Sequence, residues 1–154
     1  MGAAYFYHLT QTSLDVTLPR LLEKARGAGW KIAVRGTDPG RMEWLDQKLW
    51  LQGDESFLAH GQAGGAHDAL QPILLTTTSE NTNQADILLL THQAKTDPSE
   101  VAAYKRVCLM FDGNNANELT QARTDWKSLT EAGIAAQYWA QEDGRWTKKA
   151  EKKA

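Results

Sequence analysis

Cysteine is almost missing from this sequence. Its single copy, Cys108, excludes an internal disulfide framework and a zinc site built from several cysteines. Because Cys108 stands in the apolar run Val107-Cys-Leu-Met-Phe111, we expect a small core residue without a catalytic role. Long apolar runs are also missing: none could cross a bilayer, and the N-terminus has no basic segment followed by a long apolar one. These absences predict a cytoplasmic protein without a membrane partner.

The chain also lacks an excess of positive charge. Its net charge is −2 at pH 7, so no overall basic field points to nucleic acid. Residues 145–154 differ, because they hold five basic side chains and one acidic side chain. We interpret them mainly as a solvated, frayed chain end, with a nucleic-acid arm as the alternative. The predicted organisation is a single domain over residues 1–148 and a basic C-terminal tail over residues 149–154. Because the chain has no excess of positive charge, we expect any contact with DNA to be mainly indirect.

The signatures of several kinds of catalyst are missing too. The segment His8-Leu-Thr-Gln-Thr-Ser13 contains neither glycine nor lysine, although a nucleotide-binding domain would have its phosphate loop there. No G-x-S-x-G elbow occurs, and Asp112 belongs to a pattern typical of a strand-to-helix turn. We expect no catalytic residue, no cofactor and no metal, and a chain that is not an enzyme by itself. No two of the four histidines stand at the sequence spacing typical of a metal-binding pair; they are His8, His60, His67 and His92.

What the sequence does contain is an alternation of strand-like and helix-like segments. Apolar runs predict strands at 4–9, 31–35, 72–76, 86–90, 106–111 and 135–139. Helical spacing and end signals predict helices from Leu14 to Gly27 or Gly29, and over 37–50, 98–104 and 117–132. Such an alternation predicts an α/β fold, a Rossmann-like three-layer domain with a mostly parallel central sheet and no nucleotide-binding loop. Residues 52–71 hold four glycines without periodicity, which is typical of a loop.

One predicted helix carries the main candidate site. Over residues 117–132, the spacing places Arg123, Trp126 and Lys127 on one face. Two cations beside a flat aromatic ring suit an acidic peptide that ends in an aromatic residue, or a nucleic acid backbone with a stacked base. The alternative is that Trp126 belongs to the core and both cations are only solvated. We expect the core side of this helix to be formed by Leu119, Ala122 and Leu129.

Short fragments distributed over nearly the whole chain resemble one known family, the chi subunit of bacterial DNA polymerase III holoenzyme. Each fragment is weak alone, but their order and spacing make the match specific. The fragments are Phe6-Tyr7, Leu49-Trp50, Ser56-Phe57-Leu58-Ala59-His60, Gln71-Pro72-Ile-Leu-Leu75, Asn83, Phe111-Asp112, Ala122-Arg123, Trp126-Lys127, Ala132-Gly133, Tyr138-Trp139 and Gly144-Arg145-Trp146-Thr-Lys-Lys149.

The resemblance implies a non-catalytic replication adaptor that links the clamp loader to single-stranded DNA-binding protein. In the family, one surface holds the acidic, aromatic-ended C-terminal tail of that protein, and the matching residues here are Arg123, Trp126 and Lys127. A second surface binds the psi subunit, or a helicase in its place, and its matching residues are Trp50 and Phe57. The alternative for this aromatic pair is that it closes the core. Alternatives for the whole chain are a nucleotide-using α/β enzyme and a direct binder of single-stranded nucleic acid.

Two positions depart from the family pattern. Leu119 stands where some members carry a basic residue, so the predicted tail site has fewer cations. Ala59 replaces a common proline, which makes the segment around Phe57 less stiff.

Overall fold

The computed structural model describes residues 2–10, 14–50, 60–64, 68–143 and 145–153. The strands are β1 (Ala3–Leu9), β2 (Ile32–Arg35), β3 (Gly61–Gln62), β4 (Ile73–Thr76), β5 (Ile87–Leu90), β6 (Arg106–Asp112), β7 (Ala135–Glu142) and β8 (Arg145–Lys152). The helices are α1 (Leu14–Gly27), α2 (Pro39–Trp50), α3 (Pro98–Ala103) and α4 (Ala116–Glu131), with a short 3₁₀ helix at Asp68–Leu70.

The strands form a single eight-stranded sheet in the order β3-β4-β2-β5-β6-β1-β7-β8. Every neighbouring pair is parallel except β7 and β8, which are antiparallel. The central strands β2, β4 and β5 are buried along their whole length, as expected for parallel strands covered on both faces. The predicted α/β class and mostly parallel sheet are confirmed.

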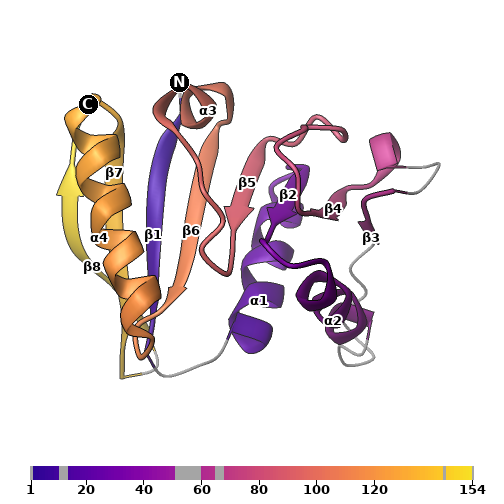
Figure 1. Cartoon of the computed structure of the whole chain (residues 1–154), viewed down its shortest axis with the longest axis horizontal. Coiled ribbons are helices and arrows are strands. Elements are labelled where there is room, and N and C mark those ends of the chain that lie inside the picture. The colour runs from indigo at the N-terminus through magenta and orange to yellow at the C-terminus, as the bar shows by residue number, and fades with distance from the viewer. Residues whose placement is uncertain (1, 11–13, 51–59, 65–67, 144, 154) are drawn as a thin grey trace.

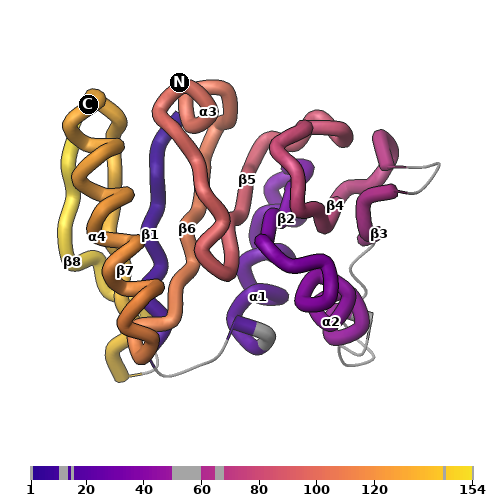
Figure 2. Tube along the Cα trace, in the orientation of Figure 1, coloured from indigo at the N-terminus to yellow at the C-terminus, as the bar shows by residue number. Residues whose placement is uncertain are grey.

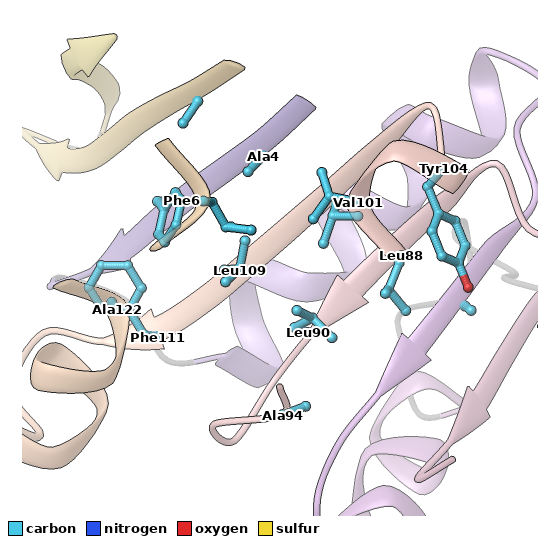
Figure 3. Packing of buried hydrophobic residues seen from close by; sticks show 14 of the residues in the cluster. Ala4, Phe6, Leu88, Leu90, Ala94, Val101, Tyr104, Leu109, Phe111 and Ala122 are labelled. Atoms are coloured by element: carbon cyan, nitrogen blue, oxygen red, sulfur yellow. The ribbon is translucent and has the colours of Figure 1, made fainter. Parts of the chain in front are cut away.

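Helices cover both faces of the sheet, which gives three layers (Figure 1). On one face, Leu18 and Leu22 of α1 join Met42 and Leu45 of α2 in a buried apolar cluster against the sheet. On the other face, a second cluster contains the buried side chains of α3 and α4, Val101, Ala122 and Leu129. Figure 3 shows this second cluster, in which Ala122 of α4 lies beside the ring of Phe111.

The course of the chain explains which helix lies on which face. The chain leaves β1, crosses β6 and β5 through α1, and enters β2 (Figure 2). It later moves in the opposite direction, through α3 and α4, to reach β6 and β7. Right-handed crossovers in opposite directions place their helices on opposite faces of a parallel sheet.

Two segments differ from the expected pattern. The loop predicted over 52–71 contains the short strand β3 and the 3₁₀ helix, within the part that the structure describes. The chain end predicted to be frayed is a strand, because β8 continues to Lys152 and pairs with β7 around a bulge near Tyr138 and Trp139. The β8 strand therefore crosses the predicted domain boundary at residues 148 and 149.

Candidate functional site

The helix α4 begins and ends as its sequence requires. Asn115 is the N-cap, and its side chain accepts hydrogen bonds from the backbone N–H groups of Asn117 and Glu118. At the other end, Gly133 adopts the left-handed conformation with φ of 86°, which glycine accepts without strain. The helix is thereby fixed at both ends, and its rotation about its own axis decides what it exposes.

The predicted core side of α4 is confirmed. Ala122 and Leu129 are buried, and Leu119 is half-buried against the same cluster. Arg123 and Lys127 are exposed. No described carboxylate lies within ion-pair distance of either cation. Both charges are therefore available to a partner.

Trp126 lies between the core and the surface. It is half-buried, and its ring meets the edge of Phe6 with 5.3 Å between centroids. Tyr138 of β7 lies 6.0 Å from the same indole at an interplanar angle of 78°. Edge-to-face packing of this kind stabilises aromatic pairs beyond the area that they bury. Trp126 is thus a packing residue with an accessible part, so its two interpretations are compatible.

His8 and Tyr138 extend this aromatic group toward Arg123. The Tyr138 hydroxyl and Nδ1 of His8 share a hydrogen bond of 2.9 Å, and the imidazole stacks on Phe111 with 5.0 Å between ring centroids. Burial, then the positive charge of Arg123, lower the pKa of His8, whereas Asp112 acts in the opposite direction. Burial raises the pKa of the Tyr138 hydroxyl, and Arg123 opposes that rise. The guanidinium of Arg123 therefore acts on both groups.

We call these five residues the Arg123 surface: His8, Arg123, Trp126, Lys127 and Tyr138. Sequence reasoning found the three helical members and missed His8 and Tyr138. A signal for His8 was present, because strand residues two apart share a face and His8 follows the buried Phe6 by two. Tyr138 had no comparable local signal, since it meets His8 only through the neighbouring strands β1 and β7.

A glycine leaves room for the imidazole of His8. Gly113 follows β6, and a Cβ added there would collide with the His8 ring. The turn that contains Gly113 is held by Asp112, whose Oδ1 accepts a hydrogen bond of 2.9 Å from the backbone N–H of Asn114. The strand-to-helix turn predicted at this position is confirmed, and it closes against the Arg123 surface.

The second predicted surface remains a prediction. Trp50 is the last residue of α2, and its side chain lies outside the described part of the chain. Phe57 also lies outside the described residues.

The place where open α/β sheets commonly hold ligands contains a buried ion pair in this molecule. Such sites lie at the carboxyl ends of two adjacent strands whose connections diverge, here β2 and β5. There the buried Arg35 forms a two-armed ion pair with Glu100 of α3, with both N···O distances at 2.8 Å. Further hydrogen bonds from Arg35 reach the backbone oxygens of Thr78 and Lys95. This buried network therefore lies at the carboxyl end of β2.

Two of the basic residues near the C-terminus are engaged in ion pairs. Lys148 lies 3.4 Å from Glu151, and Lys149 pairs with Glu142 of β7. These pairs reduce the positive charge that β8 could present to a nucleic acid.

Two further properties concern the described residues only. They contain no cluster of three or more histidine, cysteine or acidic side chains arranged for a metal ion. Among the helices described, none combines the length and the apolar character needed to span a bilayer.

Comparison with known proteins gives the family. The fold itself defines the class, a three-layer α/β domain with a mostly parallel sheet. A family model described as DNA polymerase III chi subunit, HolC, matches residues 1–137. The chain belongs to this family, as its sequence resemblance predicted.

A curated relative agrees with this assignment. The chain is similar to a protein of Rickettsia prowazekii (strain Madrid E) named "Probable DNA polymerase III subunit chi", with 28% identity over 105 residues. The match covers 68% of this chain and 62% of the relative. The chain therefore spans less than two thirds of the relative's length.

Proposed function

We propose that this chain is a non-catalytic replication adaptor, in which the Arg123 surface holds the acidic C-terminal tail of single-stranded DNA-binding protein. Membership of the DNA polymerase III chi family supports the replication role. The observation that carries the tail assignment is Arg123 itself, an exposed cation without a described ion-pair partner, beside a half-buried aromatic group. This combination has the chemistry to bind a carboxylate that follows an aromatic side chain.

In the proposed mechanism, the acidic groups of the tail bind through charge, and its last aromatic side chain binds through packing. Arg123 forms a two-armed contact with the terminal carboxylate, and Lys127 attracts the acidic residues before it. Trp126 and Tyr138 offer ring edges to the last aromatic side chain. The site is largely exposed, so its affinity is modest, on the order of micromolar, and it weakens with salt. Because DNA coated with single-stranded DNA-binding protein presents many copies of the tail, avidity raises the apparent affinity.

His8 adjusts this site electrostatically. Arg123 is one of the causes that lower the His8 pKa, so the imidazole is neutral near pH 7 and adds no charge. A carboxylate bound at Arg123 would offset that cation and favour protonation of His8. Because linkage is reciprocal, tail affinity should rise as the pH falls through the His8 pKa.

The second half of the adaptor function is assigned to Trp50 and Phe57. In the proposal, these aromatic residues anchor the psi subunit of the clamp loader, or a helicase in its place, because large aromatic side chains dominate interface energetics. The support is the family resemblance.

A peptide that copies the host tail tests the proposal. Arg123→Ala should weaken its binding roughly tenfold to a hundredfold, the cost of removing one side of a charge-assisted contact. Lys127→Ala should cost less, since an ammonium lacks the planar fork. The matched control is Arg20→Ala, which removes an exposed arginine from α1, a helix on the opposite face of the sheet.

Fluorescence anisotropy at low and moderate salt gives the affinities. Salt should weaken wild-type binding more than binding by the Arg123 variant. Equal affinity of the wild type and Arg123→Ala, or tight binding of a peptide that lacks its terminal residues, would refute this site.

A further inference from the structure

A cavity of about 300 Å³ lies on the face of the sheet opposite to the Arg123 surface. It is bounded by the last turns of α1 and by β1, β2, β5 and β6. Its volume is at the lower end of the range for small-molecule sites. Figure 1 shows α1 over the middle of the sheet, well away from α4.

The walls of the cavity are mainly apolar. Leu21 and Ala25 of α1 face Ile32, Ile87 and Leu89 of the sheet across it. No nucleobase would find enough hydrogen-bond partners among such walls, and its unpaired polar edges would be costly to bury. The interior therefore suits an aliphatic or simple aromatic body.

Tyr7 and Cys108 contribute uncharged polar groups to the cavity lining. Burial raises the pKa of the Tyr7 hydroxyl and raises the pKa of the Cys108 thiol to about 12. Both groups therefore keep their protons near neutral pH. The Tyr7 ring is fixed by an edge-to-face contact with Trp146, with 5.1 Å between centroids. Tyr7 supplies a positioned O–H donor without adding charge.

Positive charge is found among the lining residues, and negative charge is not. The charged residues that line the cavity are Lys24 of α1 and Arg106 at the start of β6. The guanidinium carbon of Arg106 lies 4.0 Å from the ring centroid of Tyr5 and 5.3 Å from that of Trp30. Stacking on aromatic rings occupies the face of a guanidinium and leaves its N–H edge available. Within the described residues, no carboxylate forms an ion pair with Arg106 or Lys24.

The surroundings do not cancel these two charges. Asp86, at the start of the neighbouring strand, is engaged by the backbone N–H of Lys31 at 3.0 Å and by Lys105 at 3.6 Å. The end of α1 contributes partial negative charge, but Arg26 donates a hydrogen bond of 2.9 Å to the Trp30 carbonyl there.

We propose that this cavity binds a small amphipathic carboxylate, with its apolar body between α1 and the sheet and its charged end at Arg106 and Lys24. The inference goes beyond the proposed tail-binding function, because it uses the opposite face of the sheet and none of the residues of the Arg123 surface.

Three small compounds test the proposal by calorimetry on the full chain. Octanoate has both the apolar body and the charge, octan-1-ol has the body alone, and acetate has the charge alone. Octanoate should bind more tightly than octan-1-ol, and acetate should not bind measurably. Equal binding of octanoate and octan-1-ol, or no binding of octanoate, would overturn the proposal.

Variants then locate the bound carboxylate. Arg106→Gln should weaken octanoate roughly tenfold or more and leave octan-1-ol unchanged, while Arg106→Lys should restore part of the loss. Lys24→Gln should have a smaller effect in the same direction. Lys48→Gln, an exposed lysine in the last turn of α2, is the matched control and should change nothing.

A cavity-filling variant tests whether the octyl compounds bind inside the cavity or elsewhere on the surface. Ala25→Leu should abolish binding of both octyl compounds while the melting temperature is kept or raised. Ala102→Leu, on the exposed side of α3, is its control. Binding that survives Ala25→Leu would refute the cavity as the site.

Arg123→Ala keeps the two proposals distinguishable. It should leave octanoate binding intact even where it abolishes binding of the tail peptide. Loss of octanoate binding in Arg123→Ala, with no loss in Arg106→Gln, would place the carboxylate on the Arg123 surface and overturn the inference.

Discussion

Removing one partner of the ion pair between Arg35 and Glu100 should lower the stability of the fold substantially. The exposed fractions of the two side chains are 7% and 17%, and both arms measure 2.8 Å. Thr96 donates a further hydrogen bond of 2.7 Å to Glu100. In Glu100→Ala, Arg35 would keep its contacts to the Thr78 and Lys95 oxygens but lose its only described counter-charge. Removing one partner of a buried pair typically costs about 3–5 kcal/mol.

Urea unfolding and calorimetry measure this cost. For a domain of this size, a loss of that magnitude corresponds to a fall in melting temperature of about 6–20 °C. Glu43→Ala, which removes an exposed carboxylate from α2, is the control and should stay within about 0.5 kcal/mol of the wild type. Arg35→Met with Glu100→Leu should recover part of the loss, because apolar replacement of both partners leaves no buried charge.

The same pair predicts how stability depends on pH. Burial acts to raise the pKa of Glu100, but the hydrogen bonds from Arg35 and Thr96 and the charge of Arg35 together lower it below its ordinary value of 4.5. The unfolded chain therefore binds this proton first on acidification, and the contribution of Glu100 is lost as pH falls below about 4.5 toward the folded-state pKa. Glu100→Ala should flatten this part of the stability profile. A variant as stable as the wild type, with the same acid limb, would refute the reasoning.

Three further predictions concern single sites. Arg123→Gln should raise the pKa of His8 part of the way toward its ordinary value of 6.5, because burial remains; an unchanged NMR titration of the imidazole would contradict the electrostatic coupling. Gly113→Ala should displace His8 and lower the melting temperature, while Gly27→Ala, where a Cβ would meet nothing within 4 Å, should not; equal melting of the two variants would argue against the close approach. Phe57→Ala should abolish binding of psi or the helicase with nearly unchanged melting. A loss of about 3 kcal/mol or more would instead favour its core interpretation.

The sequence was sufficient where structure depends on local pattern. The apolar runs of β2, β4 and β5 are short, which is typical of buried strands rather than helices. Gly133 marked the end of α4 because few other residues accept its backbone angles. The rotation of α4 was also predictable, since Ala122 and Leu129 repeat at helical spacing.

Contacts between distant residues were not predictable in this way. The hydrogen bond of Tyr138 to His8 joins residues 130 apart, and it exists only because β1 and β7 are neighbours. The ion pair of Arg35 with Glu100 similarly depends on the position of α3. A single sequence gives the elements of a parallel sheet more directly than their order, and the order decides which side chains meet.

The two edges of the sheet carry features that disfavour pairing with another strand. A strand at the edge of a sheet offers unpaired backbone groups to any other extended chain. At one margin β3 has only two residues, too few to act as a template. At the other edge β8 carries Arg145 and Lys152, which form no ion pair among the described residues, and a second copy laid alongside would meet like charge at these positions. The basic side chains of the last strand therefore disfavour edge-to-edge pairing with another strand, an effect that requires no nucleic acid.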